Sequence, residues 1–192
     1  MTKIGVIGLG NMGYEMASNL SKNKYDVFGF DNNKAILDNK QDFNFKFVSN
    51  IEDLLSKIDV LITMLPNGKI VNEVLQKSSK LLSPHTIIID SSTINVLEAQ
   101  EINEFCQKSN LFFLDAPVSG GTIGAKNATL TFMVGGDHNI LKKVEKILLT
   151  MGSKIVHCGD CGMGQAAKMC NNMILAATMT GVSEAINLSE KV

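Results

Sequence analysis

The stretch Lys3-Ile4-Gly5-Val6-Ile7-Gly8-Leu9-Gly10-Asn11-Met12-Gly13 decides the fold. It predicts a short apolar strand over residues 3–7, a G-x-G-x-x-G turn, and a helix that runs to about Leu20. A second strand is expected over residues 25–30, and Asp31 follows it, 18 residues after Gly13. A strand, a glycine turn, a helix, a strand and an acidic residue in this order predict a dinucleotide-binding unit.

Each glycine of the turn has a physical task in that interpretation. Gly8 allows a tight turn, Gly10 lets the backbone approach a pyrophosphate, and Gly13 lets the helix pack close to the strand. The first N–H groups of the helix would bind the phosphates. The alternative is a glycine-rich turn with only a structural role, which the ordered context disfavours.

Asp31 indicates which dinucleotide is expected. Its carboxylate would accept hydrogen bonds from ribose hydroxyls and would repel a 2′-phosphate, and no arginine follows it. The sequence therefore favours NAD over NADP, with Lys34 as the only nearby cation.

The remainder of the chain alternates between helices and strands. Helices are expected over residues 50–57, 68–77, 95–107 and 137–149, and strands over residues 59–65, 86–90, 111–115, 130–134 and 154–157. The strands are almost continuously apolar, which is typical of a parallel sheet covered by helices on both faces. We expect an α/β fold with a Rossmann-type doubly wound, mostly parallel sheet, followed by the start of a long helix.

Composition excludes several classes of protein. The formal net charge is -1 and no basic block occurs, which argues against nucleic acid as the main partner. No apolar run reaches the length of a membrane span, and the expected strand at Lys3 leaves no room for a leader peptide. Cys158-Gly-Asp-Cys161 lacks the second ligand pair of a zinc site, so we expect no metal. Incidental thiols in a reducing cytoplasm are the plainer interpretation.

Ligands bind beyond the carboxyl ends of such strands, and three predicted strand ends carry informative residues. Met64-Leu65-Pro66-Asn67 would turn the chain over the cofactor edge, since proline stops strand pairing. Asp90-Ser91-Ser92-Thr93 brings hydroxyl groups, which a helix cap would explain equally well. Ser119-Gly120-Gly121 offers a hydroxyl and open backbone N–H groups for a small carboxylate, or else is a flexible surface loop.

The last predicted helix opens with Gly162-Met163-Gly164 and carries no charge between Lys168 and Glu184, so we expect most of it to be buried. On a helical period Gln165, Lys168, Asn171 and Asn172 share one face. A lysine on a buried helix needs a partner or a task. The alternative is a lysine whose amine reaches the surface from a helix end.

The glycine turn, the run Asp115-Ala116-Pro117-Val118-Ser119-Gly120-Gly121 and the pattern Gly162-x-Gly164-x-x-x-Lys168-x-x-x-Asn172 together resemble the β-hydroxyacid dehydrogenase family, and within it the 3-hydroxyisobutyrate dehydrogenases. The resemblance covers essentially the whole chain. It implies oxidation of a small β-hydroxy acid to its semialdehyde, as in valine degradation. One departure is Ala128, which stands where the family usually has glycine.

The resemblance also implies a role for each matching residue. Lys168 would be catalytic, Ser119, Gly120 and Gly121 would hold the substrate carboxylate, and Asn172 would orient the substrate. The cofactor-binding residues would be Gly8, Leu9, Gly10, Asn11, Met12, Gly13, Asp31, Met64, Leu65, Pro66 and Thr93. Lys168 would act as the base, because apolar surroundings and the start of a helix both lower the pKa of a lysine.

The resemblance further implies two domains. Residues 1–161 would be the NAD-binding domain, and residues 162–192 would be the first helix of an all-helical domain of which most is missing. Because an apolar face in water is unfavourable, we expect residues 173–188 to be covered by another chain in a homo-oligomer, or else to aggregate. Three other functions stay open: a reductase of small semialdehydes, a non-catalytic dehydrogenase-like binding module, and a redox domain that uses Cys158 or Cys161.

Overall fold

The glycine turn joins β1 (Lys3–Ile7) to α1 (Gly13–Lys22), as the sequence predicts. The structure is a computed structural model that describes residues 2–33 and 44–192, so Lys34 lies outside the described residues. The other elements, in chain order, are β2 (Asp26–Phe30), β3 (Lys46–Phe47), α3 (Ile51–Leu55), β4 (Val60–Thr63), α4 (Gly68–Ser78), β5 (Ile87–Asp90), α5 (Val96–Lys108), β6 (Phe112–Asp115), β7 (Val118–Ser119), α6 (Gly121–Lys126), β8 (Leu130–Gly135), α7 (His138–Leu149), β9 (Gly152–Gly159) and α8 (Met163–Ser189).

The strands form one sheet in the order β3-β2-β1-β4-β5-β6-β8-β7, with β9 paired to β8. From β3 to β6 every pairing is parallel, and this is the doubly wound order in which the winding reverses between β1 and β4. β8 pairs antiparallel to both β6 and β7. The predicted Rossmann-type, mostly parallel sheet is confirmed.

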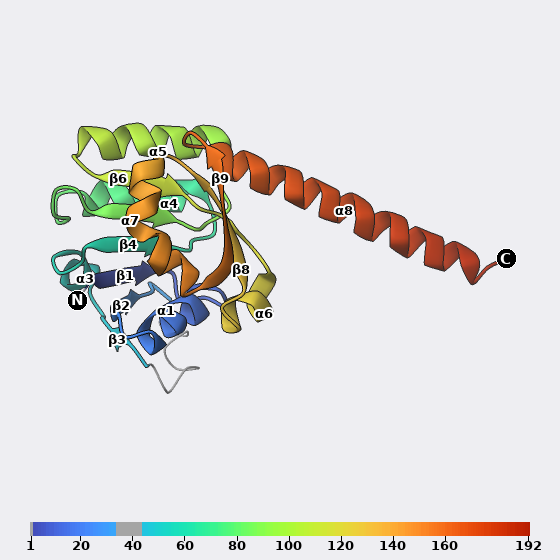
Figure 1. Cartoon of the computed structure of the whole chain (residues 1–192), viewed down its shortest axis with the longest axis horizontal. Helices are drawn as coiled ribbons and strands as arrows, with labels where there is room; N and C mark the ends of the chain where they lie inside the picture. The colour runs from blue at the N-terminus through green and yellow to red at the C-terminus, as the bar shows by residue number, and fades with distance from the viewer. Residues whose placement is uncertain (1, 34–43) are drawn as a thin grey trace.

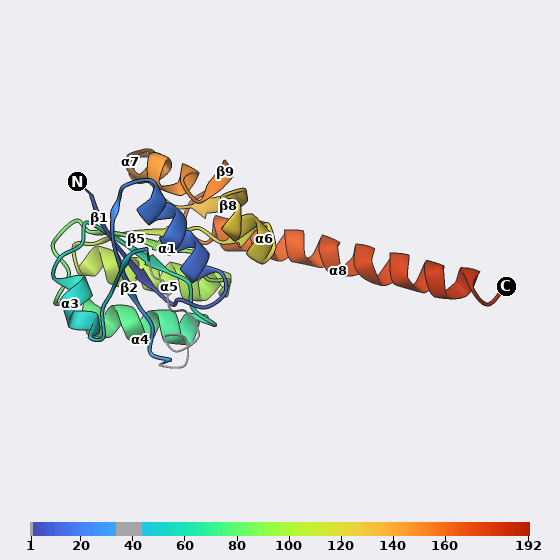
Figure 2. The same ribbon diagram turned by 90° about the horizontal axis from the view of Figure 1, so that it is seen from below.

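Two apolar cores lie on opposite faces of this sheet. α1, α6 and α7 pack on one face through side chains such as Met16, Ala125 and Leu148. α3, α4 and α5 pack on the other through side chains such as Leu54, Leu75 and Ile102. The two groups of helices are seen on either side of the strands in Figure 2.

Helix starts follow local sequence signals. The side chains of Asn50, Asn67 and Asp137 each accept a hydrogen bond from an N–H group in the first turn of α3, α4 and α7. Asn95 does the same for α5 and forms a capping box with Glu98. Each of these helices therefore begins within one residue of its expected start.

Three short elements were not expected from the sequence. β3 pairs with β2 over only Lys46 and Phe47. β7 and α6 occupy the region that one alternative treated as a flexible loop after Asp115. That alternative is wrong, because Val118 and Ser119 pair with Phe132 and Thr131 of β8.

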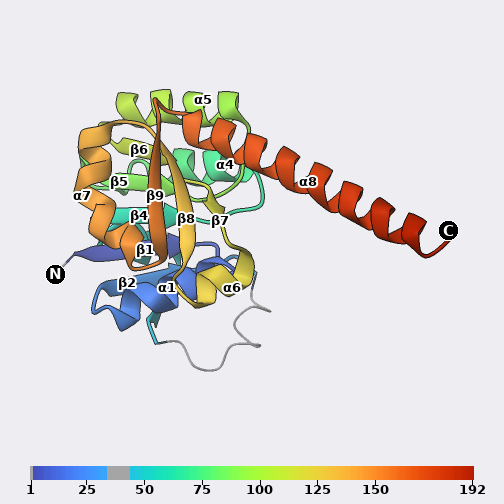
Figure 3. The ribbon, with the colours of Figure 1, turned by 45° about the vertical axis from the view of Figure 1, so that its right-hand side comes forward.

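The long helix differs from its expectation. α8 leaves the sheet and projects away from the rest of the molecule (Figures 1 and 3). Only Gly164 and Gln165 of α8 are buried, so the expected burial of most of the helix is wrong for this chain. Its large exposed apolar side chains are Met169, Met173, Ile174, Leu175, Met179, Val182, Ile186 and Leu188. Among the described residues, the loop after β5 and the start of α5 approach only the beginning of this row, where Met169 and Met173 line a hollow with Val96.

None of the described helices combines the length and the apolarity that crossing a membrane requires. The division of the chain into domains at residues 161 and 162 stays a prediction.

Candidate active site

The glycine turn lies against the end of β4. Gly8 has φ +95°, and a Cβ atom at that position would collide with the carbonyl oxygen of Met64. A Cβ atom at Gly13 would collide with the carbonyl oxygen of Gly8, so the turn and the helix need both glycines. A Cβ atom at Gly10 would meet open space, which is the side from which a ligand can approach the backbone.

Asp31 closes the turn from the end of β2. Its Oδ2 accepts a hydrogen bond from the N–H of Leu9 at 2.7 Å, and its Oδ1 accepts one from the N–H of Asn33 at 2.8 Å. Each carboxylate oxygen has a second lone pair that a hydroxyl group can use. The structure therefore places Asp31 beside the glycine turn, where the sequence predicts it.

The loops after β1, β4 and β5 are tied together at the carboxyl edge of the sheet. The N–H of Met64 donates to the carbonyl of Ile7 at 2.9 Å, and the N–H of Leu65 donates to Ser92 Oγ at 2.9 Å. Ser92 is buried while Thr93 is exposed. Because Asn95 caps α5, the alternative that the hydroxyl groups of residues 91–93 form the helix cap is wrong.

A buried carboxyl group lies beneath this edge, and sequence reasoning gave it no role. Asp90 Oδ1 accepts hydrogen bonds from Thr63 Oγ1 at 2.8 Å and from the N–H of Ser92 at 3.1 Å. Burial raises the pKa of Asp90 to about 6, against the lowering effect of these hydrogen bonds. Among the described residues, Asp90 Oδ2 and Ser91 Oγ have no hydrogen-bond partner.

The first turn of α8 is held by a second buried carboxylate that sequence reasoning missed. Asp115 Oδ1 accepts from the N–H of Gly162 at 2.7 Å, and Asp115 Oδ2 accepts from the N–H of Gln165 at 2.9 Å. Burial raises the pKa of Asp115, and these two bonds to the helix start oppose that effect. The only sequence signal was an acidic residue at a strand end, which does not reveal a partner 47 residues away.

Lys168 lies on the second turn of α8, directly beyond this anchored start, and is partly buried. Burial lowers the pKa of its amine below the ordinary lysine value. Among the described residues no carboxylate forms an ion pair with it. These surroundings favour the neutral amine that a proton acceptor needs.

Asn172 and Thr93 are brought together at one groove. They line a hollow of about 580 Å³ between α8 and the loop after β5, together with Gln165, Met169 and Met173. Asn172 is exposed in this chain, and the neighbouring Asn171 is half-buried.

The Ser119-Gly120-Gly121 turn connects β7, which pairs with β8, to α6. Ser119 ends β7 and pairs with Thr131, while α8 packs against β8 as well. Gly120 has φ +131° and Gly121 has φ +61°, conformations that disfavour a side chain. A Cβ atom at Gly121 would meet open space, so this exposed backbone is accessible to a small ligand.

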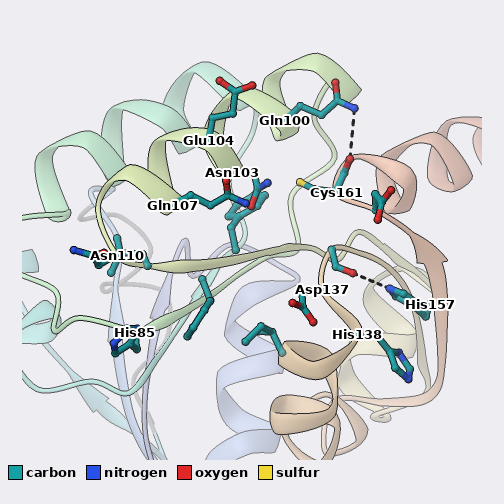
Figure 4. Close-up of a pocket in the computed structure, with 16 residues that line it drawn as sticks. His85, Gln100, Asn103, Glu104, Gln107, Asn110, Asp137, His138, His157 and Cys161 are labelled. Atoms are coloured by element: carbon teal, nitrogen blue, oxygen red, sulfur yellow. Dashed lines mark hydrogen bonds between the residues drawn. The ribbon is translucent and has the colours of Figure 1, made fainter.

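A second hollow, of about 920 Å³, lies elsewhere (Figure 4). It lies between α5 and α7, and His85, His138 and His157 are among its lining residues. His157 Nε2 lies 2.8 Å from the carbonyl oxygen of Gly136. This groove lies away from the point between β1 and β4 where the winding of the sheet reverses. We therefore assign the site to the sheet edge that carries the glycine turn, beside the smaller hollow lined by Thr93 and Asn172. The described residues contain no cluster of three or more metal-ligating side chains.

The cysteines of the CxxC pair lie in surroundings that suppress the thiolate. Burial raises the pKa of both Cys158 and Cys161, and the negative charge of Asp115 adds to the effect. A reactive redox cysteine requires a lowered pKa. The geometry therefore weighs against the redox alternative.

The comparisons with known proteins agree with this arrangement. Residues 3–159 match the family model described as the NAD binding domain of 6-phosphogluconate dehydrogenase. The chain is 42% identical over 191 residues to a probable 3-hydroxyisobutyrate dehydrogenase of Mycobacterium bovis, covering 100% of this chain and 65% of that protein. It is 46% identical over 187 residues to the mitochondrial 3-hydroxyisobutyrate dehydrogenase of Drosophila melanogaster, covering 97% and 58%.

A solved structure of Mycobacterium tuberculosis 3-hydroxyisobutyrate dehydrogenase with L-serine superposes with a TM-score of 0.94 at 42% identity. That comparison covers 100% of this chain and 66% of the other. The chain thus spans less than two thirds of the length of each of these relatives.

Proposed function

We propose, since the chain belongs to the 3-hydroxyisobutyrate dehydrogenase family of oxidoreductases, that it carries the cofactor-binding edge and the catalytic lysine of an NAD-dependent dehydrogenase. Its substrate would be 3-hydroxyisobutyrate or a close small β-hydroxy acid, oxidised to the semialdehyde. One observation carries the proposal: hydrogen bonds join the loops after β4 and β5 to the turn of α8 that precedes Lys168.

The residues at the edge fit a dinucleotide. Gly10 leaves its side of the turn open for a pyrophosphate, and the start of α1 directs N–H groups toward it. Asp31 supplies acceptors for the adenosine ribose, and its charge opposes a 2′-phosphate, which supports NAD over NADP. Gly8, Leu9, Asn11, Met12, Gly13, Met64, Leu65, Pro66 and Thr93 complete the proposed cofactor contacts.

The protein's own chemistry is then a proton transfer. NAD, when bound, supplies the acceptor for the hydride. The neutral amine of Lys168 takes the proton from the substrate hydroxyl, because partial burial lowers its pKa. Asn172 orients the hydroxyl without adding charge, and the Ser119-Gly120-Gly121 turn binds the carboxylate through its hydroxyl and backbone N–H groups.

The substrate class has support from a relative. The Mycobacterium tuberculosis relative was solved with L-serine, which is itself a small β-hydroxy acid. Reduction of tartronate, succinic or glyoxylate-type semialdehydes is the alternative within the same chemistry. Initial rates over a panel of these acids and semialdehydes, with NAD(H) and NADP(H), distinguish the two directions.

A non-catalytic binding module is the competing class of function. Such a module has no use for a half-buried lysine with a lowered pKa, and this chain retains one. Measuring NADH binding and 3-hydroxyisobutyrate turnover separates the two, on this chain and on a longer chain that extends to the full length of the relatives. Binding without turnover in both chains would favour the module.

The apolar face of α8 implies a partner. Residues 173–188 include Met173, Ile174 and Leu175, each more than half exposed, and leaving such a face in water is unfavourable. We therefore include a homo-oligomer through this helix in the proposal. Light scattering after size exclusion tests it, and a monomer at micromolar concentration contradicts it. The cytoplasmic localisation also stays a proposal, since the Drosophila relative is named as mitochondrial.

A further inference from the structure

Gln165 makes a two-sided contact with the loop after β5. Its Nε2 donates to the carbonyl oxygen of Ser92 at 2.8 Å, and its Oε1 accepts from the N–H of Ile94 at 3.1 Å. These two backbone groups flank Thr93, which is proposed to contact the cofactor. One side-chain amide thus holds the backbone before and after Thr93.

The contact is buried and continues toward the cofactor loop. Gln165 is only 2% exposed, and its own N–H is bound by Asp115. Ser92 also accepts a hydrogen bond from the N–H of Leu65 through its hydroxyl group. A continuous path of hydrogen bonds therefore runs from the loop after β4, through Ser92, to the first turn of α8.

Lys168 follows Gln165 by three residues, so the two side chains lie on neighbouring positions of one helix face. We propose that Gln165 is a positioning residue, which fixes Lys168 relative to Thr93 by clamping the backbone on both sides of Thr93. This inference rests on the proposed catalytic role of Lys168. It assigns to Gln165 a role that neither the glycine turn nor the lysine motif requires.

The chemistry of the contact explains the residue type. A donor and an acceptor at the end of one side chain are needed to satisfy a carbonyl and an N–H group together, and an amide provides both. Methionine has a similar length but offers neither strong group, and asparagine is one methylene shorter. In either variant the buried carbonyl of Ser92 and the partly buried N–H of Ile94 lose their partner, and the start of α8 can move.

The test compares Gln165→Met and Gln165→Asn with Cys170→Ala, a matched control on the exposed part of the same helix. None of the three substitutions changes the net charge at neutral pH. The acetylation rate of Lys168 by acetic anhydride is measured by mass spectrometry from about pH 7 to about pH 11, which gives the pKa of its amine directly. Thermal unfolding and NADH titration accompany each variant.

We expect the Lys168 pKa to lie below the ordinary value in the parent chain and in Cys170→Ala, and to rise toward that value in both Gln165 variants. In a chain that turns over substrate, kcat falls about 10- to 100-fold in the Gln165 variants while NADH affinity changes less than about threefold, because a small displacement of a catalytic group has effects of that size.

An unchanged Lys168 pKa in a folded Gln165 variant overturns the inference, and so does an equal rise in Cys170→Ala. If Gln165→Met fails to fold, the milder Gln165→Asn decides. If the unaltered chain fails to bind NADH, the proposed dehydrogenase function is contradicted. The acetylation measurement of the Lys168 pKa still decides whether Gln165 positions Lys168.

Discussion

The carboxylate of Asp115, at the end of β6, binds the N–H of Gly162 at a distance of 2.7 Å and so fixes the start of α8. Gly162 has φ +92°, a conformation in which its N–H turns toward the sheet edge. The same carboxylate binds the N–H of Gln165 through its other oxygen. The first turn of the helix that carries Lys168 is therefore tied to the end of β6.

Removal of this anchor has a predictable cost. Asp115→Ala leaves two buried N–H groups without a partner, so we expect a loss of about 2–3 kcal/mol in the free energy of unfolding. Asp137→Ala, which removes an exposed cap of α7, is the control and is expected to cost about 1 kcal/mol. Urea unfolding measures both values. Equal losses in the two variants would show that Asp115 is an ordinary cap.

Asp90 predicts a pH dependence of stability. Burial raises its pKa from 3.8 to about 6, so the folded state binds a proton more tightly than the unfolded state does. The stability that this group contributes is therefore fully present below its unfolded pKa of 3.8 and is lost as the pH rises through about 6. At about 1.4 kcal/mol per tenfold change in proton affinity, the loss amounts to about 3 kcal/mol.

Asp90→Asn isolates that effect, because asparagine does not titrate. We expect the free energy of unfolding of the parent chain, minus that of Asp90→Asn, to fall by about 2 kcal/mol between pH 4 and pH 7. Burial also raises the pKa of Asp115, and the subtraction leaves only the part of that titration that depends on the charge of Asp90. A difference that stays constant with pH contradicts the assignment.

Replacing Ala128 with glycine should stabilise the protein. The family resemblance places glycine here, and the structure supplies the reason, since Ala128 has φ +55° in the left-handed region. A left-handed conformation costs a residue with a side chain about 1–2 kcal/mol. Ala128→Gly should therefore raise the free energy of unfolding by about 1 kcal/mol, after the entropy of the unfolded glycine is subtracted.

Ala125→Gly is the matched control for that substitution. Ala125 lies in the short helix α6 and is fully buried, so glycine there is expected to lower the free energy of unfolding by about 1 kcal/mol. Urea unfolding of both variants gives the comparison. A loss of stability in Ala128→Gly would remove the strain explanation.

Substitution of Asp31 should change both the affinity for NADH and the preference for NADH over NADPH. Asp31→Ala removes the acceptors proposed for the ribose and the bond to the N–H of Leu9, so NADH binding should weaken by about tenfold, equivalent to about 1.4 kcal/mol. The preference for NADH over NADPH should shrink at the same time, because the repelling charge is gone. Asp26→Ala, which breaks the exposed pair with Lys46 at the other end of β2, should leave both affinities unchanged. Fluorescence titration measures them.

Much of the fold was predictable because its signals are local. The glycine turn, the apolar strands and the Asn and Asp caps each act within a few residues of the chain. The cofactor edge followed from the same signals, since consecutive parallel strands end at one edge of a sheet. Asp31 was found for this reason, directly after β2.

The contacts that assemble the candidate active site were not predictable. Asp115 meets Gly162, and Ser92 meets Gln165, across 47 and 73 residues of chain, distances at which periodicity carries no information. β7 escaped prediction because its two residues form a strand only through pairing with β8. The lack of charge in α8 wrongly indicated a buried helix, because an apolar pattern shows that a surface is to be covered but not which segment covers it. Only the family resemblance predicted that the face over residues 173–188 is exposed in this chain.

The proposed role of Lys168 as proton acceptor is tested by comparing three proteins. NADH formation from 3-hydroxyisobutyrate is followed in the parent, in Lys168→Ala and in Lys191→Ala, an exposed lysine beyond the end of α8. We expect kcat to be lower by about 10²- to 10⁴-fold in Lys168→Ala alone, with NADH affinity retained, because that variant has no proton acceptor. We also expect kcat/KM in the parent to rise with pH through an apparent pKa below the ordinary lysine value. Turnover in Lys168→Ala within about threefold of the parent would contradict this role of Lys168.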